Sequence, residues 1–186
     1  MAQTSFKAVI GPVRFSFLHV FEPHSFEGAA SKYSAVLLIP KSDTKLVEAI
    51  QKAIQLAYDA AVTERWGGKK PIMDKVTCLH DGDSPKDDGE DRGEAYKGMY
   101  FLNAKSSTQP GIVDKSRQPI IDPEELYSGC WGYASIAFSG YDSNGARGIS
   151  CFLNNIMKTK DDERLGSGKT SAADDFADID FGDDEL

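Results

Sequence analysis

The stretch that decides the fold reads SGCWGYASIAFSGY and runs from Ser128 to Tyr141. Side chains alternate between the two faces of a β-strand. One face would hold small and apolar residues (Cys130, Gly132, Ala134, Ile136, Phe138), and the other would hold polar and large aromatic ones (Trp131, Tyr133, Ser135, Ala137, Ser139, Tyr141). We therefore predict a strand with one face in the core and a polar, aromatic face outside.

A β-hairpin is expected directly after this strand. The sequence turns polar at Asp142-Ser143-Asn144-Gly145 and becomes strand-like again from Gly148 to Lys158. An Asn-Gly pair between two such runs is a strong hairpin signal. Other strands are predicted at 6–10, 13–21, 33–39 and 96–105, and Gly11-Pro12 indicates a bend or bulge between the first two.

Only one segment has the spacing of a long helix. Apolar residues recur at intervals of three and four from Leu46 to Val62, Ser42 or Asp43 can cap the start, and Gly67-Gly68 ends the pattern. Several strands and one helix predict a mainly β fold with a small barrel rather than repeated βαβ units. This domain is expected to span residues 1–160, and the polar remainder, 161–186, to form a flexible linker and tail.

Length and composition narrow the class of protein. The 186 residues, 40% of them hydrophobic, suffice for one domain with a buried core. No apolar run reaches the roughly 20 residues of a membrane-spanning helix, and the first residues lack the apolar region of a secretion signal. Three widely spaced cysteines favour neither a disulfide framework nor a zinc site. The sequence predicts a soluble protein of a reducing compartment.

The charge is unevenly distributed. The net charge is −8, but residues 174–186 hold seven acids and no base, and residues 81–94 hold seven acids and two bases. The rest of the chain is therefore mildly basic, about +4 in sum. The acidic balance belongs to a tail and a loop, and it does not argue against an anionic partner for the domain.

Aromatic and basic residues coincide in the middle of the chain. Trp131, Tyr133 and Phe101 are predicted to lie on exposed strand faces, where flat rings can stack on nucleic-acid bases. The accompanying cations that could contact phosphates are Lys97, Lys105, Lys115, Arg117 and Arg147. The alternative is that the rings form ordinary cross-strand pairs and that the lysines are merely solvated.

The acidic tail carries aromatic residues between its charges. Asp174, Asp175, Phe176 and Phe181 are predicted to form a docking peptide, in which charge steers the tail to a basic pocket and a ring anchors it. Such a tail could also occupy the domain's own basic groove and compete with nucleic acid. The alternative is a tail that only increases solubility.

No catalytic constellation is found in the sequence. Asp81 and Asp83 could hold the magnesium ion of a nuclease, which is one alternative function, and an aromatic face that docks a polypeptide would make the chain a protein–protein adaptor. Gly168-Lys169-Thr170 lacks the preceding glycine of a phosphate-binding loop. We therefore predict a binding protein, not an enzyme, without a metal or cofactor.

Several short motifs together resemble a family of tailed-phage single-stranded DNA-binding proteins. They are YFLNAKS from Tyr100, YSGCWG from Tyr127, LNNI from Leu153 and LGSG from Leu165, followed by Asp174-Asp175-Phe176. The resemblance implies an OB-fold barrel, binding of single strands without sequence preference, and a tail that contacts replication or recombination proteins. It places the protein in the cytoplasm of an infected bacterium, and we expect a monomer or weak self-association.

Overall fold

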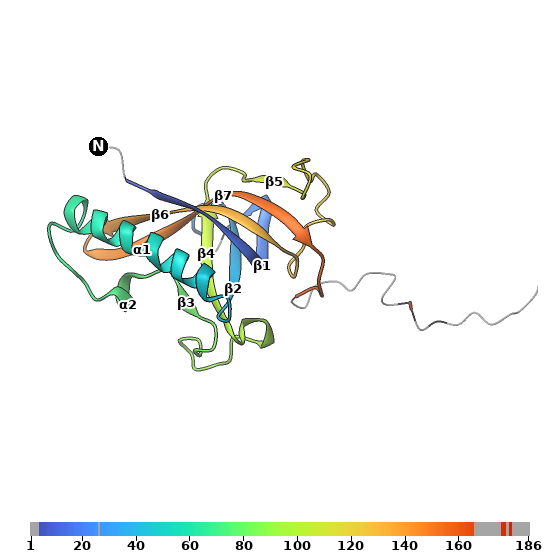
Figure 1. Ribbon diagram of the computed structural model, residues 1–186, viewed down its shortest axis with the longest axis horizontal. Coiled ribbons are helices and arrows are strands. Elements are labelled where there is room, and N and C mark those ends of the chain that lie inside the picture. Colours follow the sequence, from blue (N-terminus) through green and yellow to red (C-terminus); the bar gives the residue numbers. More distant parts are fainter. Residues whose placement is uncertain (1–3, 26, 166–175, 178, 180–186) are drawn as a thin grey trace, which may run out of the picture.

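The computed structural model describes residues 4–25, 27–165, 176, 177 and 179. Seven strands form one sheet in the order β3-β4-β2-β1-β6-β7-β5. The strands are β1 (Phe6–His24), β2 (Lys32–Pro40), β3 (His80–Asp81), β4 (Met99–Ser106), β5 (Gly111–Val113), β6 (Trp131–Ser143) and β7 (Ala146–Lys160). A further parallel pairing of β4 with β7, at Ala104 and Cys151, closes five of them into a barrel (Figure 1).

The length of β1 makes this closure possible. Its first half pairs with β6 and its second half with β2, both antiparallel. The pairing with β6 shifts register between Ile10 and Val13, at the Gly11-Pro12 pair that predicts a bend. Such shifts twist and bend a strand, so that one strand can join two sides of a barrel. The pairing of the barrel strands and the parallel closure are those of an OB-fold, as predicted.

The predicted helix is present as α1 (Thr44–Glu64), which runs alongside β6 and β7 (Figure 1). The Asp43 carboxylate accepts a hydrogen bond from the backbone N–H of Leu46 and caps the first turn. The buried side of α1 includes Ile50, Ile54 and Ala61. A Cβ at Gly140 of β6 would lie only 2.2 Å from the Cβ of Ala61, so helix and strand can approach this closely only at a glycine.

Short elements fill the long connections. Along the chain, the helix α2 (Met73–Val76) precedes β3 and the 3₁₀ turn η1 (Glu94–Tyr96) follows it, all between α1 and β4. The predicted strand 96–105 therefore begins later, at Met99. Among the described residues, no helix is long and apolar enough to cross a membrane.

Residues 161–165 directly follow β7, which ends at Lys160. Residues 161–165, predicted to belong to a flexible linker, fold back against the start of β6, where the N–H of Leu165 donates to the carbonyl of Ser128 over 2.9 Å. The Arg14 guanidinium donates to the carbonyl of Glu163 over 2.8 Å. We call residues 161–165 the strap.

Candidate nucleic-acid interface

A cleft of about 890 Å³ opens between the second half of β1, the start of β2 and the end of β4. We call it the β1–β2–β4 cleft. The residues that line it are Phe17, His19, His24, Ala29, Ala30, Lys32, Ser34, Ala35, Val36, Asn103, Ala104 and Lys105. Two lysines and two histidines are among them, and no carboxylate is, so an anionic ligand meets no repulsion from the lining itself. OB-folds use this same face, between their second and third barrel strands, to bind oligonucleotides.

Aromatic rings of β1 form one wall of the cleft. Phe17 is 60% exposed, and it has a positive φ of 45° at a point where the register with β2 shifts. His19 and His24 stack with ring centroids 4.4 Å apart and planes inclined by 14°. Strand alternation alone does not reveal this wall, because the register shifts change which side chains face outward. The available signal was the number of aromatic and histidine residues along β1, not their period.

Cations stand opposite these rings. Lys105 of β4 is the one predicted binding residue that lines the cleft, and its register partner on β2 is Ser34. Lys32, which the sequence did not single out, adds a second ammonium at the start of β2. Asn103 and Val36 are likewise register partners on β4 and β2, and both line the cleft. A phosphate oxygen and a base can thus find a cation and an aromatic ring within one depression.

An unpredicted aromatic residue, Phe152, continues this surface. It lies on β7 as the parallel partner of Lys105, and 42% of it is exposed. A large apolar ring beside an exposed lysine is the combination that supports stacking of a base with its phosphate nearby. The residue sits one position after Cys151, at the pairing that closes the barrel.

The expectation of an exposed ring at Phe101 is wrong. Phe101 does point away from the barrel core, but the connection from β3 to β4 covers it and leaves it only 5% exposed. The ring contacts Tyr96 edge-on at 5.2 Å and His80 at 5.1 Å, and the Arg92 guanidinium lies 5.0 Å from its centroid. This ring is therefore not available for stacking in the structure.

Trp131 and Tyr133 share the outer face of β6, as predicted, and neither lines the β1–β2–β4 cleft. Tyr133 is 39% exposed, and its ring lies so close over Gly11 that a Cβ there would be 2.4 Å from the ring carbon Cδ1. The Trp131 indole N–H donates to the Asp162 carboxylate of the strap over 2.7 Å. Arg14 lies 6.0 Å from the centre of the indole ring.

The remaining predicted cations are dispersed. Lys97 is exposed beside η1 and forms an ion pair with Glu94. Lys115 and Arg117 lie exposed in the turn after β5, where the Asp114 carboxylate accepts hydrogen bonds from backbone N–H groups. Arg147 forms an ion pair with Asp142 across the β6–β7 hairpin, at 3.2 Å. None of these four residues is among those that line the cleft.

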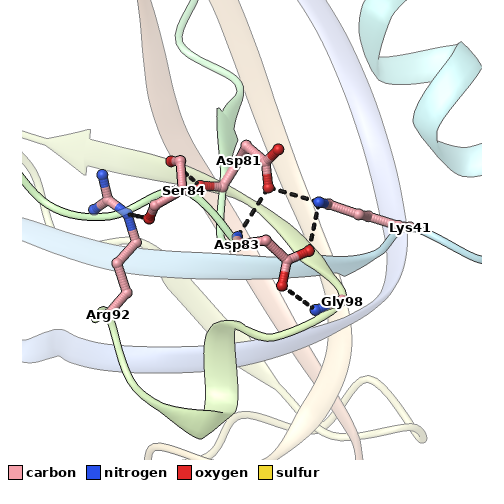
Figure 2. A network of polar contacts seen from close by, with 6 residues as sticks. All are labelled: Lys41, Asp81, Asp83, Ser84, Arg92 and Gly98. Atoms are coloured by element: carbon pink, nitrogen blue, oxygen red, sulfur yellow. Dashed lines mark hydrogen bonds and ion pairs between the residues drawn. The ribbon is translucent and has the colours of Figure 1, made fainter. Parts of the chain in front are cut away.

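The acidic pair proposed for a nuclease is held by a lysine. The Lys41 ammonium lies 2.6 Å from a carboxylate oxygen of Asp81 and 2.6 Å from one of Asp83. Figure 2 shows both ion pairs as dashed lines. Asp83 also accepts from the backbone N–H of Gly98 over 3.0 Å. The hydrogen bond to Asp81, followed by that to Asp83, raises the pKa of Lys41 to about 12, and the bond from Lys41 lowers the pKa of both carboxyl groups.

This contact ties the acidic connection to the end of β2. The Arg92 Nε donates to the carbonyl of Ser84 over 2.9 Å and closes the loop on itself (Figure 2). Within the part of the chain that the structure describes, no group of three His, Cys, Asp or Glu side chains could hold a metal ion. The carboxylates of Asp81 and Asp83 therefore hold the connection from β3 to β4 in place over Phe101.

The predicted docking peptide falls largely outside the described residues. Asp174, Asp175 and Phe181 lie there, whereas Phe176 is described and 63% exposed.

The sequence matches one protein family and one related phage protein over almost its whole length. The family described as the Enterobacter phage Enc34 ssDNA-binding protein matches residues 6–186. Protein p50 of Acyrthosiphon pisum secondary endosymbiont phage 1 is 32% identical over 189 residues, which cover 96% of this chain and 97% of p50.

Solved structures agree with this match. The chain is similar to the single-stranded DNA-binding protein of bacteriophage Enc34 in complex with ssDNA, with 27% identity, a TM-score of 0.73, and coverage of 86% of this chain and 89% of that one. The fold alone is shared with gp2.5, a single-stranded DNA-binding protein encoded by bacteriophage T7, at 16% identity and a TM-score of 0.56 over 100% of this chain and 99% of that one. These relatives are binding proteins, in agreement with the prediction that the chain is not an enzyme.

Proposed function

Because the chain belongs to the family of the Enc34 phage ssDNA-binding protein, we propose that it binds single-stranded DNA, with the principal contacts in the β1–β2–β4 cleft. The observation that carries this assignment is the combination found there. The cleft brings together an exposed phenylalanine, a pair of stacked imidazoles and two lysines, without a carboxylate among its lining residues. Stacking accepts any base and a lysine accepts any phosphate, so this set of contacts binds single strands without reading their sequence.

Duplex DNA should bind more weakly at the same surface. Phe17 and the stacked histidines offer flat faces, and a base can stack on them only when it is unpaired and unstacked from its neighbours. Each base–ring stack is worth about 1–3 kcal/mol. This term is absent for a duplex, in which the bases remain stacked on one another. The protein would therefore hold strands open and suppress hairpins.

A bound DNA strand can extend from the cleft along the barrel toward β7. Phe152 continues the surface beyond Lys105. Trp131 and Tyr133 on β6 remain candidates for further contacts, with Arg14 beside Trp131 as a cation. Lys97, Lys115, Arg117 and Arg147 would attract the strand at longer range. We omit Phe101 from this path because it is covered.

The biological task that fits such a protein is protection of single strands during phage replication or recombination, inside the infected bacterium. The acidic tail would recruit other proteins of that process and would compete with DNA for the basic surface. The seven acids of residues 174–186 support this part of the proposal.

A salt titration with a fluorescent oligo(dT) tests the proposal. If three or four phosphates are neutralised, the logarithm of the binding constant should fall with the logarithm of the salt concentration at a slope of roughly −2 to −3. Substitution of both Lys32 and Lys105 by Gln should weaken binding and make this slope shallower by about 1 to 1.5.

The matched control for these variants is Lys52→Gln, on the exposed side of α1. It removes one charge from α1, none of whose residues lines the cleft, and should leave the slope almost unchanged. Equal affinity for single-stranded and duplex DNA would contradict the stacking part of the proposal. The absence of any binding at about 50 mM salt would favour a protein–protein adaptor instead.

A further inference from the structure

The two histidines of the β1–β2–β4 cleft lie closer together than five positions along an extended strand would allow. Two register shifts in the pairing of β1 with β2, between Ser16 and His19 and between His19 and His24, accompany this approach. The rings end up stacked at 4.4 Å. Histidine is the side chain whose charge ordinarily changes between about pH 5 and 8. Two imidazoles in contact will therefore resist the gain of a second proton, since two adjacent positive charges repel each other.

The groups that face this pair also oppose its protonation. Lys32 approaches from β2 and Lys105 from β4, and of the described residues in the connection between β1 and β2, Ala29 and Ala30 line the cleft. The nearest acids in sequence are Glu22, which borders a neighbouring cleft that His19 also lines, and the exposed Glu27. Burial lowers the pKa of His19, and the adjacent His24 lowers it further. The free cleft thus favours the neutral form of the His19 imidazole.

A bound phosphodiester reverses this balance. Its negative charge would lie among the two ammonium groups and the imidazoles, and it would stabilise an imidazolium by direct attraction or by a charge-assisted hydrogen bond. We propose that the binding of single-stranded DNA in the β1–β2–β4 cleft is coupled to the uptake of a proton by the His19–His24 pair, an inference that rests on the proposed function. The proton comes from the buffer, and one neutral imidazole becomes an imidazolium.

The direction of the pH dependence follows from this coupling. DNA raises the proton affinity of the pair, so the extra binding free energy is fully present below the pKa of the free pair. It is lost as the pH rises through the pKa of the DNA-bound pair. If DNA raises that pKa by about one unit, affinity falls by at most about tenfold across the transition, between roughly pH 5.5 and 8. Salt-dependent phosphate contacts by lysine do not change over this range.

The experiment is a binding titration of the full chain with oligo(dT) from about pH 5.5 to 8.5 at constant ionic strength, with proton uptake measured by calorimetry in two buffers of different ionisation enthalpy. We expect affinity to decrease by about three- to tenfold with rising pH, and the uptake to peak at roughly 0.3 to 0.5 proton per binding event near pH 6.5. Both effects should disappear when His19 and His24 are replaced by Gln. His80→Gln is the matched control, because this third histidine lies against Phe101 rather than in the cleft, and it should leave both effects unchanged.

The outcomes separate the two proposals. Tight binding with a flat pH profile and no proton uptake would overturn the coupling but leave the proposed function intact. A pH profile that persists in the double variant would assign the proton to other groups and also overturn it. If the double variant does not fold, His24→Gln alone, at an exposed position, must reduce proton uptake. A complete lack of DNA binding at every pH would instead reject the proposed function.

Discussion

Trp131 on β6 donates its indole N–H to the carboxylate of Asp162, 2.7 Å away, and this contact fastens the strap to the barrel. The Arg14 guanidinium lies 3.7 Å from the same carboxylate. Beside it, the hydroxyl of Tyr127 donates to Asp161 over 2.8 Å. The strap is thus held against the barrel by side chains of β1, of β6 and of the connection before β6.

The strap should therefore contribute to stability. A chain that ends at residue 160 loses the hydrogen bonds to Trp131, Tyr127 and Arg14, and each such bond contributes a net of about 0.5–1.5 kcal/mol. We expect its free energy of unfolding to be about 1–3 kcal/mol lower than that of a chain that ends at residue 165. Urea unfolding followed by tryptophan fluorescence measures the difference. Equal midpoints for the two chains would show that the strap contributes nothing.

Two phenylalanines on the outside of the barrel should behave in opposite ways. Phe152→Ala removes an exposed ring beside Lys105, so affinity for oligo(dT) should fall by about 1–3 kcal/mol with little change in stability. Phe101→Ala removes a ring that three neighbouring side chains cover, so stability should fall by about 2–4 kcal/mol. Thermal unfolding and binding titrations on both variants provide the check. An affinity loss for a fully folded Phe101→Ala protein would mean that the covering connection opens to admit DNA.

This pair of residues also shows how far the sequence can be interpreted. Alternation along the strand correctly places Phe101 and Lys105 on the outer side of the barrel, and the apolar spacing correctly places α1. Alternation cannot reveal that the connection from β3 to β4 folds over Phe101, because that depends on distant contacts such as Lys41 with Asp81 and Asp83.

The β1–β2–β4 cleft was not predicted either, because it also depends on contacts between distant parts of the chain. It depends on register shifts near Phe17, on the positive φ of that residue, and on Lys32 arriving from the next strand. None of these features leaves a periodic signal in the sequence. The contacts of the strap were not predicted because four charged residues followed by a leucine look like a linker unless their partners are known.

The Lys41 contact should make the acidic connection sensitive to low pH. Its hydrogen bonds lower the pKa of Asp81 and Asp83, so the stabilisation is present above the ordinary carboxyl pKa and is lost as the pH falls through the lowered values. Hydrogen exchange of residues 82–98, corrected for the intrinsic pH dependence of exchange, should therefore show protection that disappears below about pH 4.

The variant Lys41→Gln supplies the control for this effect. It keeps a hydrogen-bond donor but removes the charge, so protection of the same residues should be lower at neutral pH and should depend less on pH. Residues of α1 serve as an internal reference, since their buried apolar contacts do not involve Lys41. Unchanged protection in the variant would show that Arg92 and the covered Phe101 ring hold the connection without help from the ion pair.

The acidic tail should compete with DNA for the basic surface. Residues 174–186 carry seven acids within the same chain, so their effective concentration near the cleft is high, and they need no diffusion from solution to reach Lys32 and Lys105. Removal of these residues should tighten oligo(dT) binding severalfold at low salt. The gain should vanish as salt rises, because screening weakens the attraction between the tail's acids and the lysines, whereas DNA also stacks on the aromatic rings. A tail of the same length in which the seven acids are replaced by Asn and Gln should behave like the truncated chain. If truncation weakens binding instead, the tail assists the contact with DNA, and competition for the cleft is the wrong description of its role.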